Sequence, residues 1–363
     1  MTTKKTHKLC VLMPSYNKGS YITQAIDSVL AQETNFDFQL IVTDDASTDE
    51  TLDIVKDFQS KHPNKIIWLP SKNNQGLLSN IIKAYKEMKC EYFCVLDPDD
   101  YYTDTHFLQK GVDFLDKNKE FSIYASGVMI MLANNTQYKR ENIKDNFIDS
   151  NFEDMLQDKA VLGHTTGSVF RNNYFNDKII QFLESKCANG YTYKEVAYRE
   201  DDFRNRVHLT TGKAHFVNEI VGIYRYVETG LYLSSNQLRQ TLLAVRAYLD
   251  MYDYFGRKDM EWIDLAIDRL CNWGGGISMD MMKDYNNIDD ILELNQILYR
   301  ISQINLNGFE KIIRTILCKI YTKNEEKEEK IKKLSLKYKI FYKIYKYLDR
   351  KIKRKLGINM EQL

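Results

Sequence analysis

Short apolar runs alternate with amphipathic segments along the first hundred residues. The runs have the length of buried strands and cover residues 9–13, 39–42, 66–69 and 92–96. The segments between them repeat apolar residues at helical spacing and cover residues 21–31, 49–59 and 78–88. We expect Ser20 to cap the first helix and Pro14 to end the first strand. Short apolar strands separated by helices predict an α/β, Rossmann-like fold, in which a mostly parallel sheet is flanked by helices.

Beyond residue 103 the pattern becomes mixed. A helix is predicted over 105–117, and strands are predicted over 121–132, 214–217 and 220–224. From about residue 235 the pattern is helical, with a glycine break at 274–276 and a charged stretch at 323–330. We therefore predict three parts, which are an α/β domain over 1–230, a helical C-terminal region over 231–322, and a charged linker with a basic amphipathic tail over 323–363.

Charge is balanced overall but unevenly distributed. The chain has 51 basic and 50 acidic residues, so its net charge of +1 gives no drive toward nucleic acid. Residues 330–363 hold 12 basic and 2 acidic residues, and Leu334, Tyr338, Phe341 and Tyr345 recur there at helical spacing. Aromatic and basic residues together suit the headgroup region of an anionic bilayer. We predict that this tail binds an anionic membrane surface; the alternative is a helix that packs on the acidic remainder of the chain.

The same residues suggest a compartment. The polar start of the chain predicts no secretory signal, and no uncharged stretch is apolar enough to predict a transmembrane helix. The six cysteines form no Cys-x-x-Cys pair, so we expect reduced thiols in the core. We therefore expect a cytoplasmic protein, peripheral on the inner face of the cytoplasmic membrane.

A polar loop follows each of the four predicted strands, at the edge where such a sheet binds its ligand. The loops are residues 14–19, 43–49, 73–76 and 97–100. The last one holds Asp97, Asp99 and Asp100, with no Lys or Arg beside them. Like charges so placed repel unless a cation joins them, and hard carboxylate oxygens suit Mg²⁺ or Mn²⁺. The alternative is an Asp-rich turn that caps the next helix.

These loops, taken in order, resemble the motifs of family 2 glycosyltransferases with the GT-A fold. The resemblance lies in Pro14-Ser15-Tyr16-Asn17, Val42 to Asp49, Asn74-Gln75-Gly76 and Leu96 to Asp100, and it extends over about residues 7–230. The resemblance implies a nucleotide-sugar donor, usually a UDP-sugar, and transfer with inversion at the anomeric carbon. It also implies Mg²⁺ or Mn²⁺ as cofactor and, for relatives that build bacterial polysaccharides or glycolipids, a glycan or lipid-linked acceptor.

The resemblance also implies residue roles. Pro14 and Tyr16 match the loop that packs against the nucleobase, Asp45 matches the carboxylate that binds the uracil, and Asp97 and Asp99 match the Asp-x-Asp metal motif. Ser79 stands where relatives often carry an arginine before the residue that matches Asn80. The full set expected to bind the nucleotide-sugar is Pro14, Tyr16, Asn17, Asp44, Asp45, Asn74, Gly76, Asn80 and Asp97.

A second acidic centre is Glu200-Asp201-Asp202, which resembles the family's Glu-Asp motif at a helix start. Inverting transfer needs a base to take the proton of the attacking hydroxyl, and a positioned carboxylate can supply it. Asp201 matches the catalytic aspartate, with Asp202 as the alternative; a plain acidic helix start is the structural alternative. His164 and Arg225 are expected on the acceptor side.

Two other functions remain open from the sequence. A nucleotidyltransferase would also use an α/β sheet and an acidic metal site, but residues 14–19 supply only one Lys and one Gly to grip a triphosphate. A non-catalytic scaffold with this fold could bind a membrane or a partner through its tail. Release of UDP from a UDP-sugar is expected only from the glycosyltransferase.

Overall fold

The computed structural model describes residues 7–172, 177–188, 199–227, 237–273 and 288–321. Internal contacts divide the chain into two compact units, residues 1–236 and 237–363, which are described separately below. The predicted glycine break at 274–276, the linker and the basic tail lie outside the described residues. Within the described residues, no helix combines the length and the apolar character needed to cross a membrane.

The first half of unit 1 confirms the predicted alternation of strands and helices. Its elements are β1 (His7–Ser15), α1 (Gly19–Leu30), β2 (Phe38–Asp44), α2 (Thr51–Lys61), β3 (Ile66–Pro70), α3 (Leu77–Glu87) and β4 (Cys90–Val95). These four strands are parallel to one another in the order β3-β2-β1-β4. The ends of β1 and β2 therefore lie side by side, with Ser15 opposite Asp44.

The second half of unit 1 extends this sheet with mixed pairing. Its elements are β5 (Tyr101–Tyr102), α4 (Phe107–Lys117), β6 (Phe121–Met131), β7 (Gln137–Lys139), β8 (Phe147–Ser150), α5 (Phe152–Leu156), the 3₁₀ turn η1 (Thr165–Gly167), β9 (Ser168–Arg171), α6 (Asp177–Ala188), α7 (Glu200–Leu209) and β10 (Lys213–Arg225). The full order is β3-β2-β1-β4-β9-β6-β10-β5, with β7 on β6 and β8 on β10. The architecture is thus the predicted α/β fold with a mostly parallel sheet and flanking helices.

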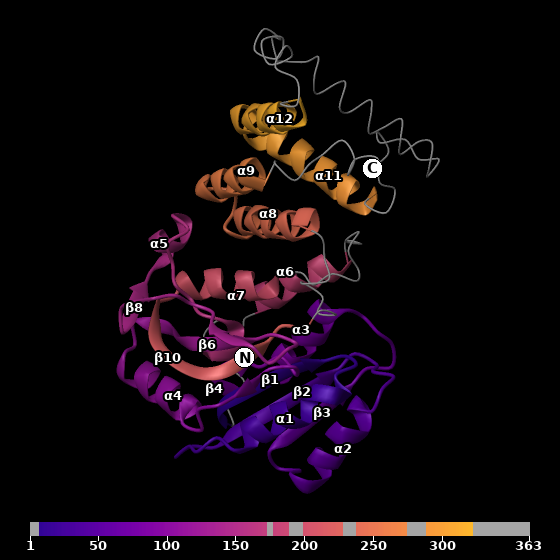
Figure 1. The fold of residues 1–363 in the computed structure, drawn as a ribbon, viewed down its shortest axis with the longest axis vertical. Coiled ribbons are helices and arrows are strands. Elements are labelled where there is room, and N and C mark those ends of the chain that lie inside the picture. Colours follow the sequence, from indigo (N-terminus) through magenta and orange to yellow (C-terminus); the bar gives the residue numbers. More distant parts are fainter. Residues whose placement is uncertain (1–6, 173–176, 189–198, 228–236, 274–287, 322–363) are drawn as a thin grey trace. The chain divides into compact units, whose positions relative to one another are not determined.

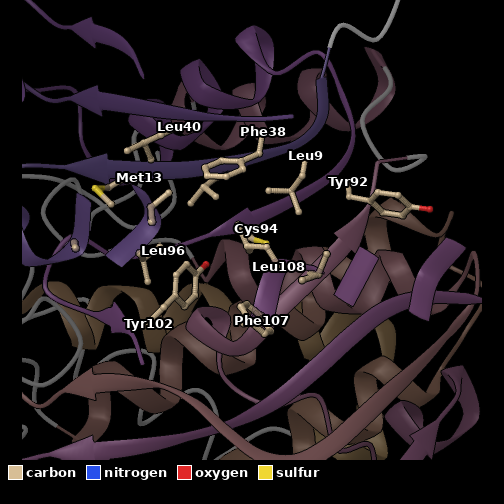
Figure 2. Close-up of a cluster of buried hydrophobic side chains, with 14 of the residues drawn as sticks. Leu9, Met13, Phe38, Leu40, Tyr92, Cys94, Leu96, Tyr102, Phe107 and Leu108 are labelled. Carbon is tan, nitrogen blue, oxygen red and sulfur yellow. The ribbon is translucent and has the colours of Figure 1, made fainter. Parts of the chain in front are cut away.

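Helices cover both faces of the sheet, as Figure 1 shows for α1, α2 and α4 on one side and α3, α6 and α7 on the other. On the first face, side chains of β1 and β4 pack against α1 and α4 in a core that includes Leu9, Met13, Cys94 and Phe107 (Figure 2). Burying one large aliphatic or aromatic side chain contributes about 1.5–3 kcal/mol. This core fixes the carboxyl ends of β1 and β4, where the polar loops begin.

Three local expectations were wrong, each for a physical reason. Pro14 does not end β1, which continues to Ser15. The Leu12 carbonyl accepts a hydrogen bond from the Leu96 amide, so it faces β4. Backbone groups alternate between the two sides of a strand, so the nitrogen of Pro14 also faces β4. The pairing of β1 with β4 ends at Leu12, and no partner there requires an N–H from residue 14. A proline is tolerated in a strand at such an unpaired position.

Ser20 does not cap α1, which begins at Gly19, two residues before the expected start, with no side-chain cap from Lys18. Instead the Asp49 carboxylate, from the loop before α2, accepts a hydrogen bond from the Gly19 amide at 3.0 Å.

The third correction concerns the strands predicted at 214–217 and 220–224. They form one strand, β10, whose pairing with β6 is irregular between Val217 and Ile220.

Unit 2 is helical in its described part, as predicted, with α8 (Gln237–Tyr254), α9 (Glu261–Trp273), α11 (Ile288–Ile304) and α12 (Leu306–Tyr321). Two acidic side chains of α11 are fully buried and paired with arginines of α8. Arg239 Nε lies 3.0 Å from Asp290 Oδ1, and Arg246 lies 2.9 Å from Glu293. These ion pairs join α8 to α11 inside the unit.

Candidate active site

Hydrogen bonds join the loops that follow β1 and β2. The Asn17 amide donates to Ser47 Oγ at 2.8 Å, and the Asn17 side-chain oxygen accepts from the Thr48 amide at 2.8 Å. Asn17 has a φ of 50°, in the left-handed region that asparagine tolerates better than most residues. Asn17 is exposed. Its backbone amide and its side-chain oxygen nevertheless hold the two loops together.

Asp44 shapes the second loop from within. Its carboxylate is fully buried and accepts from the Ser47 amide at 2.9 Å and from Ser47 Oγ at 2.5 Å. Both oxygens thus fold the chain back after β2. The buried Asp44 therefore stabilises the loop that carries Asp45.

Asp45 connects the second loop to the third. Its two oxygens accept from the amides of Gln75 and Gly76, each at 2.8 Å. Gly76 precedes α3 with a φ of 89°, which a residue with a Cβ rarely adopts. The Asn74 side-chain oxygen also accepts from the Gly76 amide, at 3.2 Å. Asp45, Asn74 and Gly76 therefore form one structural unit at the end of β2.

Asn80 joins the ends of β1 and β2 from below. Its Nδ2 donates to the carbonyls of Ser15 and Thr43, at 3.1 and 3.3 Å. The Asn80 Oδ1, Ser15 Oγ and Thr43 Oγ1 atoms are buried and have no hydrogen-bond partner within the described residues. Pro14 is buried on β1 next to them, whereas Tyr16 is 44% exposed.

The turn after β4 brings three carboxylates together. The Asp100 amide donates to the Asp97 carbonyl at 2.9 Å, which closes the turn. Asp100 is buried and accepts from Thr166 Oγ1 and, at 3.0 Å, from the Arg225 amide. Burial, followed by the charges of Asp97 and Asp99, raises the pKa of Asp100 well above its usual value. Asp100 is therefore an internal anchor of the turn.

The expectation that no Lys or Arg lies beside these carboxylates was wrong. Lys18 Nζ lies 2.5 Å from Asp99 Oδ2, and the Arg225 guanidinium donates to the Asp99 carbonyl at 2.7 Å. Both cations are far away in sequence, by 81 and 126 residues. Sequence neighbours alone could not reveal them, because the loops meet only after the sheet has formed.

Asp97 links the two acidic centres of the sequence. Its pKa is raised to about 7, first by burial and then by the charges of Asp99 and Asp201, while Lys18 and Arg204 act in the opposite direction. The turn after β4 and the start of α7 therefore lie within electrostatic reach of each other, as expected for parts of one site.

The three acidic residues at the start of α7 have different environments. Glu200 is buried and bonded to Tyr85 Oη at 2.6 Å and Arg204 at 2.8 Å. Asp202 pairs with Arg199 at 2.5 Å and with Arg206 at 3.5 Å. Asp201 is exposed, and its carboxylate has no hydrogen bond or ion pair among the described residues.

Arg204 is the part of the site that the sequence analysis missed. Its guanidinium is buried and bonds to Glu200, to Tyr85 Oη at 3.0 Å, and to Thr165 Oγ1 at 3.3 Å. It thereby joins α7 to α3 and to the turn η1. The only sequence signal was its spacing of four residues from Glu200, which places both on one side of a helix.

The two residues expected on the acceptor side contact the turn after β4. His164 lies with Nδ1 4.0 Å from Asp100 Oδ2 and packs its ring on Tyr224, at 4.4 Å between ring centroids. Burial, with smaller effects of Arg140 and Arg204, lowers the pKa of His164 to about 3, so its ring is neutral. Arg225 lies between the rings of Tyr21 and Tyr101, where its guanidinium holds the turn in place.

The donor set at this edge fits a small divalent cation in one specific way. No three His, Cys, Asp or Glu side chains in the described part of the chain are close enough to enclose a metal. Mg²⁺, however, is usually bound by one or two carboxylates together with substrate phosphates and water. Asp99 and Asp97 are two carboxylates of this kind, and Lys18 Nζ lies 2.5 Å from Asp99 Oδ2.

Residues 10–180 match the family model described as glycosyl transferase family 2. The chain is 32% identical over 189 residues to the minor teichoic acid biosynthesis protein GgaB of Bacillus subtilis, which covers 51% of this chain and 20% of GgaB. It is 26% identical over 214 residues to the poly(ribitol-phosphate) beta-N-acetylglucosaminyltransferase TarS of Staphylococcus aureus, which covers 58% of this chain and 35% of TarS. The chain thus spans about a third or less of the length of these relatives.

A solved structure of TarS residues 1–349 in complex with UDP-GlcNAc has the same fold. It aligns with a TM-score of 0.58 at 15% identity, over 86% of this chain and 91% of that one. The fold agrees with the family match, and the four loop motifs between Pro14 and Asp100 lie on the matched segment, whereas Glu200-Asp201-Asp202 lies beyond it. The chain has the GT-A fold, and its residues 10–180 are similar to glycosyl transferase family 2.

Proposed function

We propose that the chain is an inverting glycosyltransferase that moves a sugar from a nucleotide-sugar, most simply a UDP-sugar, to a hydroxyl of a glycan or lipid-linked acceptor. One observation carries the proposal. The negative charge of the unpaired Asp201 carboxylate helps to raise the pKa of Asp97. Asp97 lies in the same turn as Asp99, which pairs with Lys18. A free base and a cation-binding acidic turn are the two elements that this reaction needs.

Asp201 is the proposed general base. A base must be free to accept a proton, and the partners of Glu200 and Asp202 use those two carboxylates for structure. The positions of the three groups therefore favour Asp201 over the register shifted by one residue. Glu200 and Asp202 are proposed to orient the start of α7, through Arg204 and through Arg199 with Arg206.

Asp99 and Asp97 are the proposed ligands of Mg²⁺ or Mn²⁺. When bound, such a cation stabilises the negative charge that develops on the leaving diphosphate. Asp100 and Arg225 fix the backbone of the turn so that the two carboxylates keep their positions. A metal requirement is therefore part of the proposal.

The donor's nucleotide is proposed to bind where the loops after β1 and β2 meet. Tyr16 offers an exposed ring for stacking, and each Asp45 oxygen keeps one lone pair beyond its backbone hydrogen bond. Asn17, Asn74, Gly76 and Asn80 are proposed to shape this pocket. The TarS structure, which contains UDP-GlcNAc, supports a UDP-sugar as the first donor to try.

The remaining parts of the proposal concern the acceptor and its location. His164 and Arg225 border the turn after β4 and are proposed to face the acceptor side. GgaB is named for teichoic acid biosynthesis, which supports a surface-polymer acceptor in a bacterial cell. A peripheral site on the inner face of the cytoplasmic membrane, reached through the tail at 323–363, would bring the enzyme to such an acceptor. The three-part division at residues 230 and 322 stays part of the proposal.

The experiment is a donor-hydrolysis screen of the full chain across UDP- and GDP-sugars, with Mn²⁺ or with EDTA. The proposal expects UDP release from at least one UDP-sugar in Mn²⁺ and none in EDTA. Pyrophosphate release from a nucleoside triphosphate and a sugar phosphate would instead identify a nucleotidyltransferase. No turnover of any donor would favour the non-catalytic scaffold.

A further inference from the structure

The contact between Lys18 and Asp99 has a role beyond holding two loops together. Lys18 follows β1 and precedes α1, and its backbone amide donates to Thr51 Oγ1 at 2.8 Å. The backbone of Lys18 is thus fixed by a bond that does not involve its side chain. Its Nζ is then free to reach across to the turn after β4.

The ammonium of Lys18 neutralises charge where the acidic centres meet. It lies 2.5 Å from Asp99 Oδ2, and it acts on Asp97 as well. The two side chains are only 23% and 16% exposed, so water screens their interaction less than it would at the open surface. Lys18 therefore places a positive charge directly against the acidic turn.

We propose that Lys18 is the resident counter-ion of the donor site and is exchanged for the divalent cation when the nucleotide-sugar binds. This inference rests on the proposed function, because it assigns Asp99 to the metal. An ammonium 2.5 Å from Asp99 Oδ2 repels a divalent cation that binds the same carboxylate, because two positive charges at such a distance oppose each other. A metal that binds alone meets this repulsion unless Lys18 moves away, whereas a metal bound together with a diphosphate brings negative groups that the released ammonium can contact.

The exchange couples metal binding to donor binding. Without the donor, occupation of Asp99 by Lys18 reduces the apparent affinity for the metal to the intrinsic affinity multiplied by the fraction of time that the ammonium is away from Asp99. With the donor, the phosphates compensate for the displaced ion pair. Lys18 thus favours binding of the metal and the nucleotide together over binding of the metal alone.

The test is a titration of Mn²⁺ into the full chain, followed by electron paramagnetic resonance of free Mn²⁺, for wild type and Lys18→Met without nucleotide. If the ammonium holds Asp99 about 90% of the time, Lys18→Met binds Mn²⁺ about tenfold more tightly. Lys18→Gln, which also lacks the charge but stays polar, should show the same gain. Circular dichroism of each variant verifies that the fold is intact.

The matched control is Lys8→Met. Lys8 is 26% exposed and pairs with Glu91 and Asp116 at 2.9 Å, so the variant removes the same charge from a different acidic pair. A gain in Lys18→Met and Lys18→Gln but not in Lys8→Met supports the exchange. An unchanged or weaker affinity in the Lys18 variants, or an equal gain in Lys8→Met, overturns it.

Titration with UDP present separates this inference from the proposed function. Suppose that wild type binds Mn²⁺ with UDP present, and that Lys18→Met binds Mn²⁺ no more tightly than wild type without UDP. This result refutes the exchange and agrees with the proposed metal site. Absence of Mn²⁺ binding in every protein, with and without UDP, refutes the metal site and the exchange together. With UDP present, we expect the advantage of Lys18→Met to disappear.

Discussion

Replacement of Arg204 by methionine tests how the start of α7 is held. The guanidinium is 1% exposed and makes three hydrogen bonds, to Glu200, Tyr85 and Thr165. Methionine fills a similar volume but leaves the Glu200 carboxylate without its charge partner. Breaking a buried ion pair from one side costs about 3–5 kcal/mol, and we expect the free energy of unfolding of unit 1 to fall by that amount.

The expected loss depends on pH with a definite sign. Burial already raises the pKa of Glu200 above its ordinary value of 4.5, and Arg204 opposes that shift. Without Arg204 the pKa of folded Glu200 rises further, so folding takes up a proton at a pH above 4.5. The variant should therefore be least destabilised at acid pH, where Glu200 is protonated in both states. Its stability relative to wild type should decline as the pH rises from 4.5 through the raised folded value.

Hydrogen-exchange mass spectrometry of β1 and β4 peptides in increasing urea measures this loss within unit 1. The control is Lys61→Met, because Lys61 is 62% exposed and its pair with Asp57 is a surface pair worth less than about 1 kcal/mol. A loss below about 1 kcal/mol in Arg204→Met, or a loss independent of pH, would refute the buried network as a support of α7.

Three further predictions follow from single contacts. Gly76→Ala forces a Cβ into a φ of 89°, and we expect UDP affinity to fall together with about 1–3 kcal/mol of stability, measured by calorimetry and urea melts. Arg246→Met removes the 2.9 Å ion pair with the buried Glu293, so α8 and α11 amides should lose about 3–5 kcal/mol of exchange protection while unit 1 stays unchanged. Asp99→Ala should nearly abolish UDP release and the Mn²⁺ dependence of donor binding; normal turnover in that variant would show that the metal assignment is wrong.

The strands and helices of the first half could be predicted because each buried strand is an apolar run of its own. Leu9 to Met13 and Tyr92 to Leu96 consist of apolar residues, so the sequence alone indicates that they are buried. The strands β9 and β5 could not be predicted in this way. Each is short, and it is defined by its neighbours: β9 lies between β4 and β6, and β5 pairs with β10.

The carboxylates of the site could be predicted from the sequence, but their counter-ions could not. Asp97 and Asp99 stand out because they follow a buried strand directly. Lys18 and Arg204 reach the site only through contacts between distant segments, so their positions follow from the fold and not from local pattern. The choice between Asp201 and Asp202 likewise depends on Arg199 and on its 2.5 Å pair with Asp202.

The most direct test of the account compares Asp201→Asn with Asp202→Asn in the rate of UDP release from the donor found by the screen. Asparagine keeps the shape of the side chain but cannot accept the proton. We expect Asp201→Asn to lower the rate by about 10²–10⁴ while UDP binds with unchanged affinity, and Asp202→Asn to have a much smaller effect. The reverse order would move the base to Asp202. Full activity in Asp201→Asn, or a product that retains the anomeric configuration of the donor, would contradict the proposed mechanism.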